Sequence, residues 1–323
     1  MRLSLLDRSR TRLGRPEAEG LTGSIDRAVE AERLGYDRFW VAEHHAVPGI
    51  ASGSPPVLLA AIGARTSHIR LGSGGVMLPN HQPLVVAEQF LMLEALHPGR
   101  IDLGIGRSLG FTPPVRDALR HDADGPDTFE ADLDELRHLL DGDAAVTAHP
   151  VTHGSVPMTL LATGRGLEIA ARLGLPVVVG GPILFKDAGL DAIAAYRRDF
   201  RPSRHGADPH VTISLDVTVA ADDATARELA LPEAWAMARS RQTGEFPPLE
   251  APAAIRAQQW STQLTQRVES SLDQAVAGSP STVRRRLDEL VSRTGADELM
   301  ASTSTHHRDD LLASDALLRE IVT

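Results

Sequence analysis

The sequence predicts an α/β protein in which parallel strands alternate with helices around one core. Short runs rich in branched and aromatic residues recur along the 323 residues, and amphipathic stretches of helical length separate them. Glycine follows several of these stretches, because the position past a helix end favours a left-handed backbone. The length suits one (β/α)8 barrel of about 250 residues plus insertions. We therefore predict a single TIM-like barrel domain over residues 1–323.

Eight strand candidates follow one another along the chain. They are Leu3–Leu6, Arg38–Val41, Arg70–Ser73, Ile101–Leu103, Met158–Leu161, Val177–Val179, Thr212–Val219 and Glu298–Ser302. The joints carry helix signals: Leu34-Gly35 and Leu173-Gly174 end helices, and Ser279-Pro280 begins one with a capping hydroxyl. Residues 232–278 hold additional helices before the eighth strand, and we predict that they form an insertion over the barrel mouth.

Composition excludes several classes of function. The net charge of −10 with scattered basic residues argues against a nucleic-acid partner. No apolar run reaches the roughly 20 residues of a membrane span, and the early charges near the N-terminus do not fit a secretory signal. We therefore expect a cytoplasmic protein without a membrane partner. The lack of cysteine excludes disulfides, thiolate nucleophiles and cysteine-based metal sites.

The most informative segment is 38–45, where an apolar strand runs into Glu43, His44 and His45. The carboxyl ends of strands in parallel α/β folds carry ligands and chemistry, and ionisable groups are costly to bury there without a purpose. Four interpretations are open: catalysis, a core histidine bonded to the backbone, a histidine–carboxylate pair that fixes a loop, and a metal site. Adjacent side chains of an extended segment alternate in direction, so a metal would need a further ligand such as His81. We predict no metal.

Glycine recurs at or just past the predicted strand tips, as in Gly74-Gly75 and Gly180-Gly181. Such glycines suit tight turns, and they also let a flat ligand approach the backbone. Arg107 and the segment Thr163-Gly164-Arg165-Gly166 together offer a guanidinium, a hydroxyl and a helix N-terminus, which are the groups that a phosphate prefers. The alternative is a surface arginine and an ordinary helix cap.

Five segments together carry a family resemblance. They are Trp40-Val41-Ala42-Glu43-His44-His45, Gly72-Ser73-Gly74-Gly75-Val76-Met77-Leu78-Pro79-Asn80-His81, Pro83-Leu84-Val85-Val86-Ala87-Glu88-Gln89, Leu96-His97-Pro98-Gly99-Arg100-Ile101-Asp102-Leu103-Gly104-Ile105-Gly106-Arg107 and Gly295-Ala296-Asp297-Glu298-Leu299-Met300. With them the chain resembles the flavin-dependent bacterial luciferase-like monooxygenases over nearly its whole length. It looks closest to the subgroup of actinobacterial polyketide-tailoring oxygenases, of the mensacarcin epoxide-forming type.

The resemblance implies a TIM-like barrel that binds reduced FMN (FMNH2) at its C-terminal mouth and uses O2 to oxidise or epoxidise a hydrophobic natural-product intermediate. It implies a separate flavin reductase as partner and a homodimer. It also implies that His44 is the catalytic histidine, with Glu43 and His45 as neighbours that shape it. A histidine with a pKa near neutrality is suited to exchange protons with a flavin or a substrate.

The resemblance also implies the cofactor contacts. The tip of the third strand would lie under the isoalloxazine ring, where relatives often have a strained or cis non-proline peptide. Arg107 and the turn after the fifth strand would contact the phosphate. The residues concerned are Ser73, Gly74, Gly75, Arg107, Thr163, Gly164 and Arg165.

Two alternatives stay open. The first is an F420-dependent hydride transferase on the same barrel, which would need no oxygen. The second is a non-catalytic barrel that has lost tight flavin binding, although Glu43 and His44 argue against it.

Overall fold

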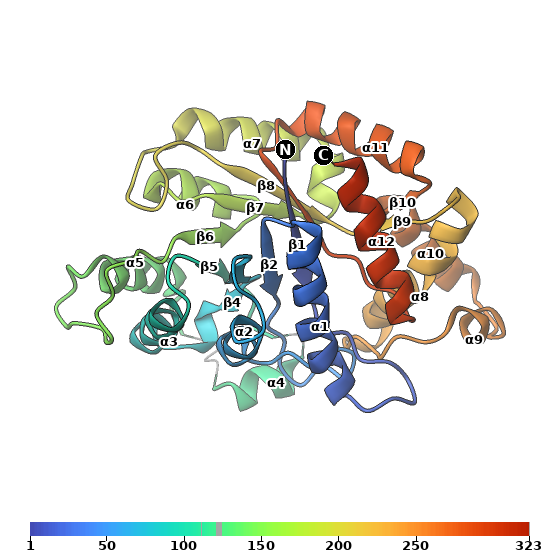
Figure 1. Cartoon of the computed structure of the whole chain (residues 1–323), viewed down its shortest axis with the longest axis horizontal. Coiled ribbons are helices and arrows are strands. Elements are labelled where there is room, and N and C mark those ends of the chain that lie inside the picture. The colour runs from blue at the N-terminus through green and yellow to red at the C-terminus, as the bar shows by residue number, and fades with distance from the viewer. Residues whose placement is uncertain (111, 121–124, 323) are drawn as a thin grey trace.

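Parallel strands form a closed barrel at the centre of the computed structural model, with helices around them (Figure 1). The structure describes residues 1–110, 112–120 and 125–322. The order around the sheet is β3-β2-β1-β11-β8-β7-β6-β5, and β3 pairs with β5 to close it. This confirms the predicted TIM-like (β/α)8 barrel. The barrel strands are β1 (Arg2–Asp7), β2 (Arg38–Val41), β3 (Arg70–Ser73), β5 (Ile101–Gly106), β6 (Met158–Leu161), β7 (Val177–Gly180), β8 (Val211–Leu215) and β11 (Glu298–Ala301).

The helices cover the outside of the barrel and end as the sequence indicates. Gly35, Gly174 and Gly295 each adopt the left-handed conformation just past a helix, and Ser279 caps a helix by accepting the Thr282 N–H. Among the described residues, no helix is both long enough and apolar enough to cross a membrane. The helices are α1 (Ala18–Leu34), α2 (Pro55–Gly63), α3 (Pro83–Leu96), α4 (Pro113–Ala118), α5 (Phe129–Asp141), α6 (Arg165–Leu173), α7 (Asp187–Asp199), α8 (Asp223–Thr243), α9 (Pro252–Arg256), α10 (Thr262–Gln274), α11 (Pro280–Thr294) and α12 (Arg308–Ile321), with 3-10 turns η1 (Leu78–Asn80) and η2 (Gly181–Phe185).

Trp40 packs with Val178 and Met300 in a cluster separate from the larger core. Its indole leaves no room for side chains on two nearby strands. A Cβ on Gly72 would lie 2.4 Å from the Trp40 ring, and one on Gly104 would lie 2.7 Å from it. Trp40 therefore requires glycine at position 72, whereas at position 104 the Ser73 carbonyl oxygen, 2.1 Å from the Cβ position, adds to the same requirement.

The seventh predicted strand, Thr212–Val219, is two strands in the structure. β8 ends at Leu215, and β9 (Val217–Val219) pairs with β10 (Val276–Gly278) in a separate two-stranded sheet. Asp216 lies at the break, where its carboxylate accepts a hydrogen bond from Ser302 at 2.8 Å. The prediction of one continuous strand was wrong because the apolar pattern continues across Asp216 while the partner strand changes. A short strand that the sequence did not predict, β4 (Val76–Met77), follows β3.

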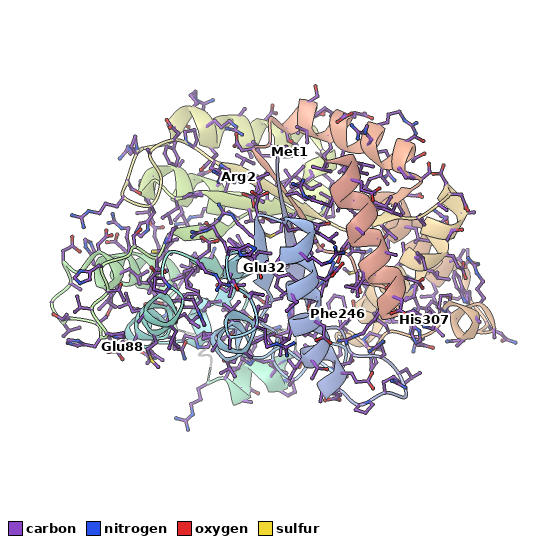
Figure 2. All side chains as sticks on the ribbon, in the orientation of Figure 1. Met1, Arg2, Glu32, Glu88, Phe246 and His307 are labelled. Carbon is purple, nitrogen blue, oxygen red and sulfur yellow. The ribbon has the colours of Figure 1, made fainter. Side chains whose placement is uncertain are left out.

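The additional helices before β11 begin inside a longer helix. α8 continues through Pro232, so the helical segment has no boundary at residue 232. Trp235 and Trp260, with ring centroids 5.2 Å apart, belong to a small core of this segment that is separate from the main one. The loop between α8 and α9 reaches the barrel mouth. There the guanidinium of Arg10 lies 5.9 Å from the ring centroid of Phe246, which is labelled in Figure 2.

Candidate active site at the C-terminal mouth of the barrel

Glu43 joins two histidines from neighbouring strand tips. Its Oε1 lies 2.7 Å from Nε2 of His45 and 2.7 Å from Nε2 of His81, while its Oε2 accepts the Met77 N–H at 3.1 Å. Burial works against the charged carboxylate, but the hydrogen bonds from His45 and His81 outweigh it and lower the pKa of Glu43 to about 2. Glu43 is therefore a permanent anion that orients both imidazoles.

His44 follows Glu43 on the same loop and is half-buried. Its backbone N–H donates to the Ser52 carbonyl at 2.9 Å, and the Ser52 hydroxyl donates to the Ala42 carbonyl at 2.7 Å. Burial, with the positive charges of Arg8 and Arg10, lowers the pKa of His44 to about 4. The imidazole is therefore neutral at pH 7, and its pKa lies well below the near-neutral value that the sequence analysis expected for this histidine.

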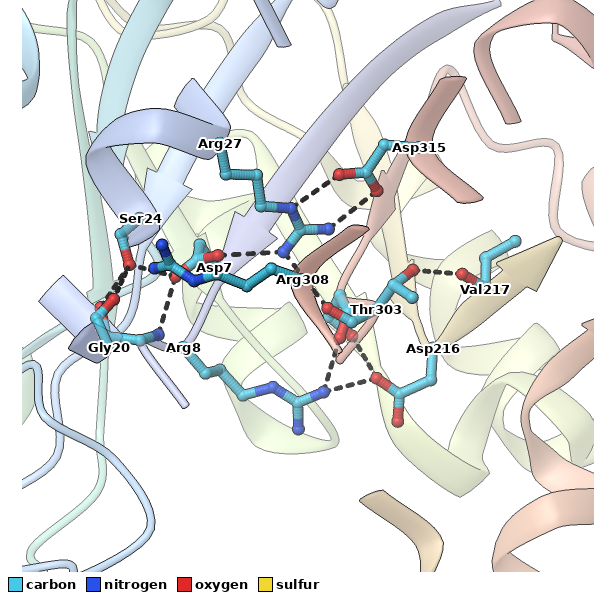
Figure 3. A network of polar contacts seen from close by, with 12 residues as sticks. Asp7, Arg8, Gly20, Ser24, Arg27, Asp216, Val217, Thr303, Arg308 and Asp315 are labelled. Carbon is cyan, nitrogen blue, oxygen red and sulfur yellow. Dashed lines mark hydrogen bonds and ion pairs between the residues drawn. The ribbon is translucent and has the colours of Figure 1, made fainter. Parts of the chain in front are cut away.

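Two arginines from the loop after β1 lie close to His44, and sequence reasoning missed both. Arg8 donates to Asp216 at 2.5 Å, a contact drawn in Figure 3, and to Glu233 at 3.0 Å. Arg10 donates to the other oxygen of Glu233 at 2.9 Å. The acids and the arginines lie more than 200 positions apart, so no local pattern could have indicated the cluster.

A second buried network supports this side of the mouth (Figure 3). Arg27 of α1 donates to both oxygens of Asp315 of α12, at 2.7 and 2.9 Å, and to Asp7 at 3.0 Å. Asp7 also accepts from the Ser24 hydroxyl at 2.6 Å. Buried charges need such partners, and here they tie α1 and α12 to the end of β1, just before Arg8.

The tip of β3 is a closely packed glycine turn. The peptide bond between Gly74 and Gly75 is cis, in agreement with the geometry expected at this tip. A Cβ on Gly75 would lie 2.9 Å from the Gly104 carbonyl oxygen, so backbone approaches backbone here. Ser73 is fully buried, and its hydroxyl donates to the Gly104 carbonyl at 2.7 Å. Its side chain therefore joins β3 to β5.

Arg107 lies at the end of β5 but is engaged by protein groups. Its guanidinium pairs with Asp127 and lies 5.6 Å from the ring centroid of Phe129. Phe129 is the first residue of α5, and Asp127 lies just before that helix. A phosphate at this position would have to replace Asp127 as the partner of Arg107.

The predicted phosphate turn begins α6. Gly164 occupies the N-cap position with a φ of 52°, and no atom lies within 4 Å of the place where its Cβ would be. Arg165 is largely exposed and lies 3.7 Å from Glu130. Thr163 and Gly164 therefore present an open helix N-terminus, whereas the Arg165 side chain lies toward α5.

Glu43, His45 and His81 also meet a spacing that a metal ion could bridge, since one ligand atom from each lies within 4.8 Å of the others. His81 is the further residue that the sequence analysis required for a metal site. Both Nε2 atoms share one carboxylate oxygen at hydrogen-bond distance. In this arrangement each imidazole donates a proton to Glu43, whereas a metal ligand needs a free lone pair. The distances describe a hydrogen-bonded cluster, and the absence of a metal stays a prediction.

Comparison with known proteins identifies the family. The model of the luciferase-like monooxygenases matches residues 1–298. The chain belongs to this family. A luciferase-like monooxygenase of Escherichia coli (strain K12) is 37% identical over 306 residues, which cover 93% of this chain and 90% of that protein. The crystal structure of apo-MsnO8 superposes with a TM-score of 0.89 at 36% identity, covering 99% of this chain and 98% of that one. This luciferase-like monooxygenase is accordingly an enzyme of the flavin-dependent monooxygenase class.

Two more distant structures share the fold of this luciferase-like monooxygenase. The oxygenating constituent of 3,6-diketocamphane monooxygenase from Pseudomonas putida, in complex with FMN, has a TM-score of 0.74 at 18% identity, covering 99% of this chain and 97% of that one. An F420-dependent secondary alcohol dehydrogenase has a TM-score of 0.70 at 13% identity, covering 99% and 97% of the two chains. Proteins of this fold therefore include one with a flavin and one with a deazaflavin cofactor.

Proposed function

We propose that the protein is the oxygenase component of a two-component system, which uses FMNH2 and O2 to oxidise or epoxidise a hydrophobic natural-product intermediate. The observation that carries the proposal is a neutral imidazole, His44, at the same end of the barrel as the glycine turn of β3. A separate flavin reductase supplies the reduced cofactor, and the enzyme acts in the cytoplasm as a homodimer.

The residues of the mouth fit a flavin. Gly74 and Gly75 give a tip without side chains that a flat ring can approach. The open N-terminus of α6 at Thr163 and Gly164 suits a phosphate, with Arg107 as its cationic partner once Asp127 has moved away. Bound reduced flavin supplies the electrons that activate O2.

His44 handles the proton in this reaction. With a pKa of about 4 the imidazole is a weak base and the imidazolium a strong acid, so His44 takes up a proton only transiently and returns it as the product forms. Glu43 acts indirectly, because it holds His45 and His81 in fixed orientations around His44. We call the loop of residues 42–54, which carries His44, the catalytic loop. The loops over the barrel mouth keep water from the reacting groups.

The decisive experiment is to add purified protein to photoreduced FMN under argon and then to admit air. We expect saturable binding of reduced FMN and a change in the rate at which its absorbance near 450 nm returns. The proposal is wrong if the protein neither binds reduced or oxidised FMN nor alters that rate.

The second candidate function is hydride transfer with F420, favoured by the shared fold with the F420-dependent alcohol dehydrogenase. It predicts binding of F420 and turnover of an alcohol or imine under argon. Parallel titrations with FMN and F420, followed by one anaerobic and one aerobic assay, separate the two candidates.

A further inference from the structure

One buried carboxylate from α8 bridges the two arginines that lie beside His44. Glu233 is 5% exposed, and its two oxygens accept from Arg8 at 3.0 Å and from Arg10 at 2.9 Å. Burial opposes the charge on Glu233, but Arg10 and Arg8 outweigh it and lower its pKa. Neither arginine can leave this position without separating a buried ion pair, which is costly.

Arg10 continues the contact to the loop that carries His44. Its Nη1 donates to the Gly49 carbonyl at 2.6 Å, and its Nη2 donates to the Pro247 carbonyl at 3.3 Å. The Gly49 N–H donates to the Phe246 carbonyl at 2.8 Å. A Cβ on Gly49 would lie 2.2 Å from the Pro247 oxygen, so this approach requires glycine. Arg10 therefore fastens the loop after β2 to the loop after α8.

We propose that Glu233 is a positioning residue of the reaction, which acts through Arg8 and Arg10 to fix both the catalytic loop and the charge beside His44. The proposal rests on the role proposed above for His44. It assigns a catalytic purpose to α8: the helix supplies the buried carboxylate that organises the charged side of the mouth.

The electrostatic part of the proposal can be separated from the structural part. The ionisable groups that face His44 are Arg8 and Arg10 from the loop after β1, Glu43 and His45 from its own loop, and Glu233 from α8. The arginines disfavour the imidazolium, and Glu233 partly offsets them. Neutralising Glu233 therefore lowers the pKa of His44 further, whereas neutralising Arg10 raises it. If Glu233 and Arg10 had only structural roles, their two substitutions would not shift the His44 pKa in opposite directions.

The test is an NMR titration of the His44 ring in the full chain with ¹³C-labelled histidine, with the signal assigned from the spectrum of His44→Gln. We expect Arg10→Gln to raise the His44 pKa, and Glu233→Gln to lower it, each by about half a unit or more. The matched control is Glu228→Gln on the same helix, where an exposed Glu228 pairs with Arg256. It should leave the titration unchanged.

Kinetics gives a second measurement. In a plot of the reaction rate against pH, the limb on the acid side should move with the His44 pKa in each variant. Glu233→Asp, which keeps the charge, should restore part of the wild-type profile. If Glu233→Gln does not fold, Arg10→Gln and Arg8→Gln carry the titration, and Glu233→Asp is the variant expected to stay near wild type. His44 titrations that stay within about 0.2 units of wild type in every folded variant that removes a charge at these positions would overturn the proposal. Failure of the proposed function would show instead as absent flavin binding in the wild-type protein, with the NMR result unaffected.

Discussion

Glu43 and His81 meet across two strand tips, with Oε1 of one 2.7 Å from Nε2 of the other. Glu43 belongs to the loop after β2, and His81 follows the short turn after β4. The contact therefore fixes the loop after β2 against the segment that contains the glycine turn. Because His45 uses the same oxygen, one buried carboxylate sets the orientation of both rings.

Replacing Glu43 tests this arrangement. Glu43→Gln removes the charge that both imidazoles need, and a neutral amide oxygen accepts more weakly. We expect a loss of about 1–3 kcal/mol in the free energy of unfolding, measured by urea denaturation, together with lower turnover. Glu88→Gln on α3 is the control, because Glu88 is only half-buried and accepts a longer hydrogen bond, from the His149 N–H at 3.3 Å. A Glu43→Gln protein as stable and as active as wild type would contradict the role given to this carboxylate.

His44→Ala addresses proton transfer. General acid–base catalysis contributes about 10²–10⁴-fold, so we expect turnover to fall by that factor with little change in the affinity for FMN. Turnover is measured by substrate oxidation, and the affinity for FMN is measured by quenching of FMN fluorescence. Unchanged turnover would remove His44 from the mechanism, whereas loss of FMN binding alone would make it a binding residue.

Gly75→Ala tests the close approach at the tip of β3. The added Cβ would lie 2.9 Å from the Gly104 carbonyl oxygen, which is backbone and cannot turn aside. We expect a loss of about 1–3 kcal/mol of stability and weaker flavin binding. Gly106→Ala is a matched control, because its nearest neighbour would be at an ordinary 3.8 Å. Equal effects of the two substitutions would show that the close approach is unimportant.

Substitutions of Arg107 and Asp127 test whether this pair contacts the phosphate of FMN or its ring system. Arg107→Ala should weaken the binding of FMN about tenfold or more, the loss of roughly one charge-assisted hydrogen bond, and should leave riboflavin binding unchanged. Asp127→Asn should strengthen FMN binding, because it frees the guanidinium from a competing carboxylate. Calorimetric titration with both ligands measures this. If Arg107→Ala weakened the binding of riboflavin and FMN equally, the phosphate would not lie at Arg107.

The lowered pKa of Glu298 makes part of the stability of the protein depend on pH. Glu298 is 1% exposed, and burial raises its pKa, but His210, Arg38 and Ser4 outweigh burial and lower it. Its folded pKa lies below the unfolded value of about 4.3, so its contribution is present above that pH and is lost as the pH falls through the folded pKa. Glu298→Gln should therefore cost about 1–3 kcal/mol at pH 7, with the difference from wild type shrinking below about pH 4. Urea denaturation across this range is the measurement, and a difference that does not vary with pH would contradict the assignment.

The sequence predicted the barrel because each strand is a local pattern bounded by local signals. The ends of helices at Gly35, Gly174 and Gly295 are similarly local, since only a few backbone angles are involved. The break at Asp216 is different in kind. It depends on which strand pairs with which, and the apolar alternation of 212–219 is the same on both sides of it.

The candidate site likewise contains residues that a local pattern indicates and residues that only the folded chain brings together. Glu43, His44 and His45 are consecutive at a strand end, so a cluster of ionisable groups on the loop after β2 could be predicted, and its catalytic role stays a prediction. Glu233 meets Arg8 and Arg10 only because α8 returns to the mouth after more than 200 residues. The contact of Arg107 with Asp127 was likewise missed, because a cation suited to phosphate is equally suited to a nearby carboxylate.

The distribution of the three tryptophans gives the protein two built-in optical reporters. Trp40 is sealed within the barrel, whereas Trp235 and Trp260 lie against each other in the small core around α8. A Trp40→Phe protein would emit only from the α8 region, and a Trp235→Phe, Trp260→Phe protein only from the barrel. Emission from the first, recorded while ligands are added, would reveal whether that region shifts when the mouth is filled.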